Sequence, residues 1–266
     1  MSAVVQQEVQ DGVALLTLNR PERLNAWTGE MENLYFDLLE ACADDQDVRA
    51  IVVTGAGRGF CAGADMDDLR SLGGAEGNGS AAAAREVRER RPQSLPLSIP
   101  KPVIAAINGP CAGIGLVQAL MCDVRLAAAG AKLTTAFARR GLVAEHGISW
   151  MLPRLVGPSR AMDLLLSARV VLAEEACELG LVNRVLPQEE LLQGALDYAR
   201  DLARNSSPAS MAAIKRQVYG DLERGLLEST RDADVLMVGS FSKPDFREGV
   251  ASFLERREPQ FAPLAR

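Results

Sequence analysis

Short apolar runs and helically spaced apolar residues alternate along the first half of the chain. Runs typical of buried strands, several of them rich in β-branched residues, occupy 13–18, 48–54, 102–107, 123–127 and 132–135. Apolar residues at the spacing of an amphipathic helix occupy 29–42 and a stretch near 113–121. The first half is therefore expected to be α/β.

After Gly147 the pattern becomes helical. Helix-compatible segments span 147–155, 158–167, 173–179, 187–204, 208–220, 224–239 and 245–256. Only 182–186 has the pattern of a strand, and Pro208 and Pro244 fall at helix starts, where proline is tolerated. We expect an α/β region over 1–200 and a helical region over 201–266.

The composition is that of an ordinary globular protein, with 48% hydrophobic and 24% charged residues. No apolar run reaches the roughly 18 residues of a membrane span, and the N-terminus lacks the basic-then-apolar order of a signal peptide. A cytoplasmic protein without a membrane partner is expected. The net charge of −6 disfavours broad binding of nucleic acid.

The segment 72–95 contains a loop-like stretch and a cluster of arginines. A glycine-rich then alanine-rich stretch at 73–84 predicts a loop that enters a helix. That helix carries a basic cluster, which we interpret as a solvated helix face, formed by Arg85, Arg88, Arg90 and Arg91. We expect the segment 72–95 to contribute to substrate selection.

The spacing of the cysteines and the single histidine argue against disulfide frameworks and common metal sites. The five cysteines are widely spaced without a C-x-x-C pair, so reduced thiols are expected rather than disulfides or a zinc ribbon. His146 is the single histidine, which excludes an H-E-x-x-H motif, and no metal site is expected. In an enzyme of this composition, a carboxylate or the backbone must carry the chemistry.

Two segments join a strand to a helix through small residues. One is RGFCAGADM at 58–66 and the other is INGPCAGIGL at 107–116. Phe60 stands where a dinucleotide-binding fingerprint needs its last glycine, so that interpretation is disfavoured. Helix N-termini leave N–H groups unpaired, and two facing N-termini could hold a carbonyl oxygen that gains negative charge.

The chain resembles the crotonase superfamily of enoyl-CoA hydratases and isomerases over nearly its whole length. Six motifs occur in the right order: RPERLNAW at 20–27, GRGFCAGADM at 57–66, KPVIAAINGPCAGIGL at 101–116, CDVRLA at 122–127, GLVNRVLP at 180–187 and FREGVASFLERREPQF at 246–261. The resemblance implies a spiral of ββα units followed by a helical trimerisation region, assembled as a trimer or a hexamer. It also implies an acyl-CoA substrate, with coenzyme A as part of the thioester and no prosthetic group.

The resemblance places the two backbone donors of an oxyanion hole at Ala64 and Ile114. Ile114 stands where the family usually has the middle glycine of a G-G-G run. Contacts with coenzyme A are implied for Arg23, Leu24, Ala26, Ala62, Ala64, Asp65, Met66, Phe253 and Arg256, the last two across a subunit boundary.

Departures from the family pattern indicate which reaction to expect. The two water-activating glutamates of hydratases fall on Val117 and Phe137, which, with Gly141, are expected to line a dry acyl pocket. Glu145 matches the position where certain isomerases of the superfamily place a single catalytic acid. We therefore expect a 3-enoyl-CoA to 2-enoyl-CoA isomerase, in which His146 is a neighbour of Glu145 rather than a catalyst.

Other functions stay open at this stage. Glu145 could activate water in a hydratase, a lyase or a hydrolase. A dehalogenase is disfavoured because its general-base histidine falls on Arg90. The missing hydratase glutamates also leave a non-catalytic relative that binds CoA or RNA, although the net negative charge disfavours RNA. The other prediction for Glu145 is structural: an acidic residue favourable to the N-terminus of the following helix.

Overall fold

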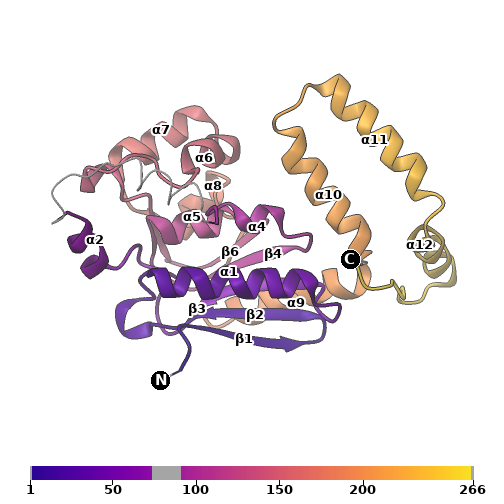
Figure 1. The fold of residues 1–266 in the computed structure, drawn as a ribbon, viewed down its shortest axis with the longest axis horizontal. Coiled ribbons are helices and arrows are strands. Elements are labelled where there is room, and N and C mark those ends of the chain that lie inside the picture. The colour runs from indigo at the N-terminus through magenta and orange to yellow at the C-terminus, as the bar shows by residue number, and fades with distance from the viewer. Residues whose placement is uncertain (1, 74–90, 265–266) are drawn as a thin grey trace.

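The computed structural model describes residues 2–73 and 91–264. Its main sheet has the strand order β1-β2-β3-β4-β6-β9 (Figure 1). These strands are β1 (Val5–Gln10), β2 (Val13–Leu18), β3 (Ala50–Gly55), β4 (Val103–Ile107), β6 (Val124–Ala128) and β9 (Arg184–Leu186). β1 and β2 form an antiparallel hairpin, and every other pairing in this sheet is parallel.

A smaller sheet has the order β5-β7-β8. It consists of β5 (Cys111–Ala112), β7 (Lys132–Thr134) and β8 (Val171–Leu172). β5 pairs in parallel with β7, and β7 pairs antiparallel with β8. Since β5 directly follows β4 in the chain, the small sheet continues from the carboxyl edge of the main sheet.

Helices pack against the sheets. They are α1 (Gly29–Asp44), α2 (Met66–Gly73), α4 (Leu95–Ser98), α5 (Ile114–Leu120), α6 (Ile148–Val156), α7 (Pro158–Ser167), α8 (Ala173–Glu178) and α9 (Leu191–Asn205). α9 packs on β2, β3, β4 and β6 through a buried alanine face, Ala195, Ala199 and Ala203. Of the strands beneath it, β3 and β4 are buried at every position, as their continuous apolar runs predict.

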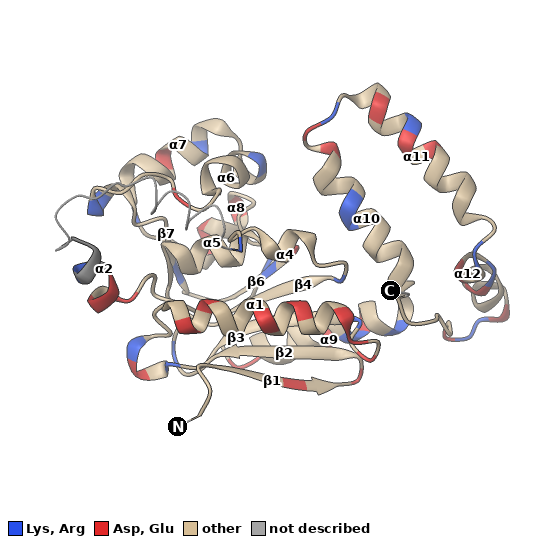
Figure 2. Ribbon diagram, in the orientation of Figure 1, with Lys and Arg blue, Asp and Glu red and all other residues tan. Residues whose placement is uncertain are grey.

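Acidic residues recur along α1 (Figure 2), and Glu30, Asp37 and Glu40 among them are exposed. Arg91 donates to Asp37 Oδ1 (2.6 Å) and Glu40 Oε2 (3.0 Å) of this helix. For Arg91 the expectation of a solvated helix face is therefore wrong: it lies outside the helices and joins the segment before α4 to the surface of α1. Arg85, Arg88 and Arg90, and the predicted loop at 73–84 beyond its first residue, lie outside the described residues.

Three helices form a C-terminal arm that extends away from the sheets: α10 (Pro208–Asp221), α11 (Leu226–Ser240) and α12 (Pro244–Glu255) (Figure 1). A buried ion pair fixes its root, because Lys215 Nζ lies 2.7 Å from Asp123 Oδ2. Tyr219 donates to Asp123 Oδ1 (2.9 Å), and the N–H of Val103 donates to Oδ2 (2.7 Å). One carboxylate thus joins the arm to the start of β4.

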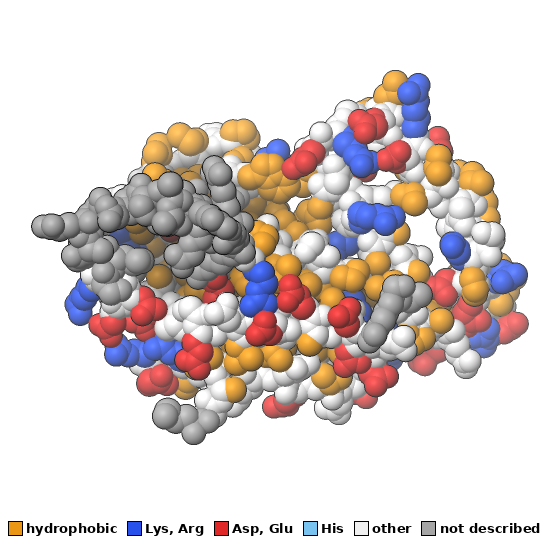
Figure 3. All heavy atoms as spheres, in the orientation of Figure 1, with side chains coloured by type: hydrophobic (Ala, Val, Ile, Leu, Met, Phe, Trp, Pro, Cys, Tyr) orange, Lys and Arg blue, Asp and Glu red, His pale blue; other side chains and the backbone are white. Residues whose placement is uncertain are grey.

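The arm leaves large apolar side chains exposed (Figure 3). They include Ile214, Val218, Leu226, Leu227, Val235, Met237, Val238, Phe241, Phe253 and Leu254. An apolar face of this size is typical of a surface that associates with another protein. Among the described residues, no helix is both long enough and apolar enough to cross a membrane.

Most predicted elements are present, with differences at short strands and at ends. β1, β5 and β8 and the short helix α4 were not predicted, and α9 begins at Leu191 rather than at residue 187. β1 is exposed at five of its six positions, so it has no apolar run. β5 and β8 are two residues long each, too short for any periodicity.

Candidate active site

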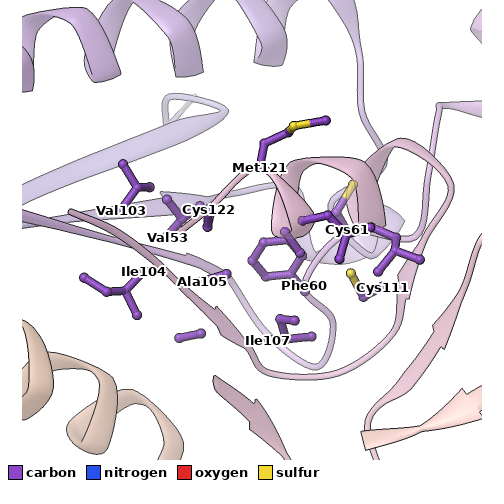
Figure 4. Close-up of a cluster of buried hydrophobic side chains, with 14 of the residues drawn as sticks. Val53, Phe60, Cys61, Val103, Ile104, Ala105, Ile107, Cys111, Met121 and Cys122 are labelled. Atoms are coloured by element: carbon purple, nitrogen blue, oxygen red, sulfur yellow. The ribbon is translucent and has the colours of Figure 1, made fainter. Parts of the chain in front are cut away.

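Two backbone segments run side by side at the carboxyl ends of β3 and β4. Cys61 donates its N–H to the carbonyl of Pro110 (3.1 Å), and Ala112 donates to the carbonyl of Cys61 (2.9 Å). A Cβ atom on Gly115 would lie 2.3 Å from the Cys61 carbonyl oxygen, so only glycine permits this approach. Figure 4 shows Cys61 and Cys111 in the buried cluster where the segments meet.

The first segment presents the N–H of Ala64. Ala64 forms an isolated parallel bridge with Trp27. The bridge uses the groups on either side of Ala64: Trp27 donates to the Gly63 carbonyl (2.8 Å), and Asp65 donates to the Trp27 carbonyl (2.9 Å). In a parallel pairing of this kind the N–H of the central residue points away from its partner.

The second segment presents the N–H of Ile114. Ile114 is the first residue of α5, where an N–H has no acceptor inside the helix. Gly113 precedes it with a φ of +51°, a conformation that favours glycine, and donates to the carbonyl of Thr134 (3.1 Å). Within residues 2–73 and 91–264, no main-chain carbonyl accepts a hydrogen bond from Ala64 or Ile114.

Both residues line a cavity of about 900 Å³. From α1 and the residues before it, the lining includes Trp27, Thr28, Gly29 and Glu32; from the far wall it includes Ala136, Phe137, Arg140, Leu142, Glu145 and His146. Arg23, Asp65, Met66 and Asp68 lie along another part of the lining. A cavity of this size accommodates a small-molecule ligand.

Glu145 and His146 lie immediately before α6. The side chain of Glu145 is about one-third exposed, and its Oε2 lies 3.5 Å from Nε2 of His146. His146 and Gly147 both have left-handed backbone conformations, with φ of +57° and +81°. Such a conformation is uncommon for a residue other than glycine, and it often marks a functional segment. The Glu145 carbonyl accepts from Ile148 N–H (3.0 Å), so the turn leads directly into the helix.

The Asp65 carboxylate is held by a backbone hydrogen bond and by an ion pair. Its Oδ1 accepts a hydrogen bond from the N–H of Asp67 (3.0 Å), and its Oδ2 lies 3.0 Å from Nη2 of Arg20. The Asp67 N–H, together with the Arg20 guanidinium, lowers the pKa of the Asp65 carboxyl. Asp65 therefore caps α2 as an anion and holds the segment that carries Ala64.

Glu32 is a buried carboxylate in the cavity wall, 2% exposed. Its Oε2 accepts from Nε1 of Trp27 (3.1 Å) and from Nε2 of Gln93 (2.7 Å). Gln93 Oε1 in turn accepts from Nε2 of Gln118 (2.6 Å). A chain of buried polar groups thus connects α1 to α5.

The structure brings most of the sequence-predicted site residues together. Those that line the cavity are Arg23, Ala26, Ala62, Ala64, Asp65, Met66, Ile114, Phe137 and Glu145. Val117 does not, because its side chain is fully buried in the core. Leu24 and Gly141 also lie outside the lining, as do Phe253 and Arg256 at the end of α12 in the arm.

Sequence reasoning missed Trp27, Glu32 and Arg140 as cavity residues. A signal for Glu32 was present, because it shares a helix face with Phe36 and Leu39, four and seven residues later. A carboxylate on an apolar face needs partners or a role. Arg140 became part of the wall only through the short 3₁₀ turn Ala138–Arg140, which has no clear sequence signature.

The cysteines are free thiols, four of them buried. Burial raises the pKa of both Cys61 and Cys122 to about 12, so these thiols stay protonated near neutral pH. Among the residues that the structure describes, no three histidine, cysteine or acidic side chains are grouped so as to hold a metal ion.

Comparison with known proteins gives a family match over nearly the full chain. Residues 8–263 match the family described as enoyl-CoA hydratase/isomerase. The chain is 38% identical to a 1,2-epoxyphenylacetyl-CoA isomerase from Escherichia coli (strain K12), covering 98% of this chain and 99% of that protein. It is also 38% identical to a probable enoyl-CoA hydratase from Rhodobacter capsulatus, covering 97% of each.

Solved structures agree in fold. A probable enoyl-CoA hydratase/isomerase from Mycobacterium abscessus is 32% identical, with a TM-score of 0.88 over 98% of this chain and 99% of that one. The enoyl-CoA hydratase EchA12_1 from Mycobacterium marinum is 51% identical, with a TM-score of 0.71 over 84% of this chain and 100% of that one. The expected α/β crotonase fold with a C-terminal helical region is confirmed, and the structure shows that its strands form two sheets.

Proposed function

The chain belongs to the enoyl-CoA hydratase/isomerase family, and we propose that it moves the double bond of an acyl-CoA thioester from the 3,4 to the 2,3 position. The observation that carries the proposal is Glu145, a partly exposed carboxylate in a cavity that is also lined by the Ala64 and Ile114 backbone. A base and a pair of backbone donors are what this reaction needs.

In the proposed mechanism the thioester oxygen accepts hydrogen bonds from the N–H groups of Ala64 and Ile114. Glu145 removes a proton from C2, and the electron pair moves into the thioester to give a dienolate whose oxygen is held by those two donors. The protonated Glu145 then delivers a proton to C4 while the double bond forms between C2 and C3. Atoms and charge balance without any other reactant.

The wall near Glu145 supports isomerisation over hydration. Hydratases of this family use two glutamates at positions that read Val117 and Phe137 here. Val117 is buried in the core, and Phe137 presents an aromatic ring to the cavity. Neither side chain can hold or deprotonate a water molecule, whereas the 1,2-epoxyphenylacetyl-CoA isomerase relative supports the isomerase class.

Hydration is the second candidate, favoured by the identity to probable enoyl-CoA hydratases. Proton NMR distinguishes the two reactions when trans-3-hexenoyl-CoA and crotonyl-CoA are each incubated with the protein in D₂O. Isomerisation gives the 2-enoyl thioester from the first substrate and no 3-hydroxyacyl product. Rapid formation of 3-hydroxybutyryl-CoA from crotonyl-CoA would overturn the isomerase proposal.

Glu145→Gln tests the assignment of the acid/base. We expect isomerisation to fall by about 10²–10⁴ while the affinity for a saturated acyl-CoA stays within about threefold. Glu189→Gln, an exposed residue outside the cavity, is the matched control and should retain wild-type turnover. Persistent turnover in Glu145→Gln would move the acid/base to another residue.

The same proposal includes self-association through the C-terminal arm. The exposed apolar side chains of α11 and α12 would be covered by a second copy of the chain, which would bring Phe253 and Arg256 of one copy to the CoA-binding part of another. Light scattering of Leu227→Glu and wild type measures this directly. A wild-type protein that remains monomeric at micromolar concentration would contradict the association.

A further inference from the structure

The two segments that carry Ala64 and Ile114 are connected twice. The direct connection is the backbone contact at Cys61 and Ala112. The second is a chain of buried side chains in which each member is hydrogen-bonded to the next: Gln118, Gln93, Glu32 and Trp27. The proposed isomerisation assigns no role to this chain.

The chain begins on the helix that presents the N–H of Ile114. Gln118 lies four residues after Ile114 on α5, on the same side of the helix, and is 2% exposed. Its Nε2 donates to Oε1 of Gln93 (2.6 Å) and, at 3.4 Å, to the main-chain carbonyl of Gln93. Because α5 is only seven residues long, holding Gln118 limits how far the first turn of the helix can rotate.

The middle of the chain uses both ends of the Gln93 amide. While Oε1 accepts from Gln118, Nε2 donates to Oε2 of Glu32 (2.7 Å). Gln93 is 7% exposed and Glu32 is 2% exposed, so water does not compete freely for these bonds. Hydrogen bonds in such a low-dielectric setting are stronger than in water, and a connected set of them is rigid.

The chain ends at the segment that presents the N–H of Ala64. Nε1 of Trp27 donates to the same Oε2 of Glu32 (3.1 Å). The backbone of Trp27 donates to the Gly63 carbonyl (2.8 Å) and accepts from the Asp65 N–H (2.9 Å), on either side of Ala64. The Trp27 side chain therefore couples the Ala64 segment to the polar chain.

We propose that Gln93 and Gln118 are positioning residues that set the separation between the N–H groups of Ala64 and Ile114. The inference rests on the proposed function, because this separation matters only where both groups hold one thioester oxygen. The direct contact fixes the segments at Cys61, and the chain fixes α5 beyond its first turn. A displacement of about 1 Å at a reacting centre can cost about 10²-fold in rate.

Gln118→Met and Gln93→Met test the proposal, because methionine fills similar space but cannot make the amide hydrogen bonds. With trans-3-hexenoyl-CoA, we expect kcat to fall about tenfold to a hundredfold and KM to change less than about twofold. The double variant should lose no more than about twofold beyond the weaker single variant, since both substitutions break one chain. Gln118→Asn keeps an amide but retracts it by one methylene, and we expect the same direction of change.

Infrared spectroscopy separates positioning from stability. Butanoyl-CoA labelled with ¹³C at the thioester carbonyl is saturated, so its carbonyl stretch can be recorded in the bound state without isomerisation. Two N–H donors should lower the stretching frequency of the bound thioester below that of the free one. In each glutamine variant, we expect this shift to shrink by about half or more.

Lys101→Met is the matched control. Lys101 is also buried, and its Nζ donates to the carbonyls of Cys42 (2.6 Å) and Asp45 (2.5 Å) at the C-terminal end of α1. The substitution therefore removes buried hydrogen bonds outside the chain and should lower the free energy of unfolding. We expect it to retain the wild-type kcat and carbonyl frequency. An equal loss in Lys101→Met and in the glutamine variants would overturn the positioning role.

The outcomes separate this inference from the proposed function. Wild-type kcat and carbonyl frequency in the glutamine variants would overturn the positioning role and leave the isomerase proposal standing. A carbonyl shift that depends on Gln93 and Gln118, in a protein that does not isomerise trans-3-hexenoyl-CoA, would support the positioning role and overturn the reaction. If the wild type does not bind butanoyl-CoA, or binds it without a carbonyl shift, both proposals are wrong.

Discussion

Nε2 of His146 lies 3.5 Å from Oε2 of Glu145, and these consecutive side chains both line the cavity. The proximity raises the question of which group transfers the proton. The carboxylate is the group whose chemistry matches the proposed isomerisation, because it can accept a proton at C2 and return the same proton at C4. The imidazole is placed to orient that carboxylate.

His146→Asn separates the two roles. Asparagine tolerates the left-handed conformation at this position, where φ is +57°, so the turn before α6 should be retained. We expect the rate of isomerisation to fall less than about tenfold, compared with about 10²–10⁴ for Glu145→Gln. A loss in His146→Asn as large as that in Glu145→Gln, measured in the same NMR assay, would assign proton transfer to the imidazole.

Gly115→Ala should damage the site without touching a side chain of the cavity. The added Cβ would lie 2.3 Å from the carbonyl oxygen of Cys61 and must push apart the two segments that carry Ala64 and Ile114. Overpacking of this kind costs about 1–3 kcal/mol of unfolding free energy. Denaturant titration and the rate of isomerisation should both report a loss.

Gly239→Ala is the control for that substitution. Gly239 lies within α11, and a Cβ there meets nothing within 4 Å. Alanine is the better helix former, so stability should be unchanged or slightly higher and turnover should be retained. If Gly115→Ala were as stable and as active as Gly239→Ala, the surrounding backbone would accommodate the added Cβ without loss of stability or turnover.

Asp65 should make part of the stability depend on pH. Its carboxyl has a lower pKa in the folded protein than in the unfolded chain, so the folded state binds fewer protons and is favoured above the unfolded value of about 4. Against Asp65→Asn, we expect the wild type to be more stable by roughly 1 kcal/mol at pH 7. That advantage should disappear as the pH falls through the unfolded and then the folded pKa. A difference in stability between the two proteins that stays constant with pH would contradict the lowered pKa of the Asp65 carboxyl.

Lys215→Met should reveal how strongly the arm is anchored. The substitution leaves the Asp123 carboxylate without its 2.7 Å cationic partner in a buried setting. Breaking such a pair by removing one member costs about 3–5 kcal/mol of unfolding free energy. The double variant Lys215→Met/Asp123→Asn should be more stable than the single one, and calorimetric unfolding measures both. A single variant as stable as the wild type would mean that the pair contributes nothing to the arm.

Continuous apolar runs predicted the core of the fold correctly. β3 and β4 are buried at every position, so their hydrophobic runs carry a clear signal. β1 pairs with β2 along its whole length, yet five of its six residues are exposed, and its sequence Val5–Gln10 is mostly polar. An edge strand held by backbone hydrogen bonds has no pattern that distinguishes it from a loop.

The site was predictable where a motif fixes the backbone and less so where side chains converge from distant elements. The family resemblance implies Ala64 and Ile114, and the structure shows the two segments that carry them in contact at Cys61 and Ala112. The chain from Glu32 through Gln93 to Gln118 joins residues up to 86 positions apart, 118 less 32, and no local spacing reports it. The roles assigned to these residues stay predictions.

The two proposed oxyanion donors, the N–H groups of Ala64 and Ile114, belong to the backbone, which affects how related sequences are compared. Substitutions at Ala64 and Ile114 by any residue except proline preserve the N–H, so the identity of either residue says little about whether the function is retained. The geometric requirement lies at positions with no room for a Cβ: one added to Gly109 would lie 2.1 Å from the carbonyl oxygen of Arg58, and one added to Gly115 would lie 2.3 Å from that of Cys61. Related sequences that keep this backbone arrangement are therefore expected to keep glycine at the positions of Gly109 and Gly115, whatever residues stand at Ala64 and Ile114.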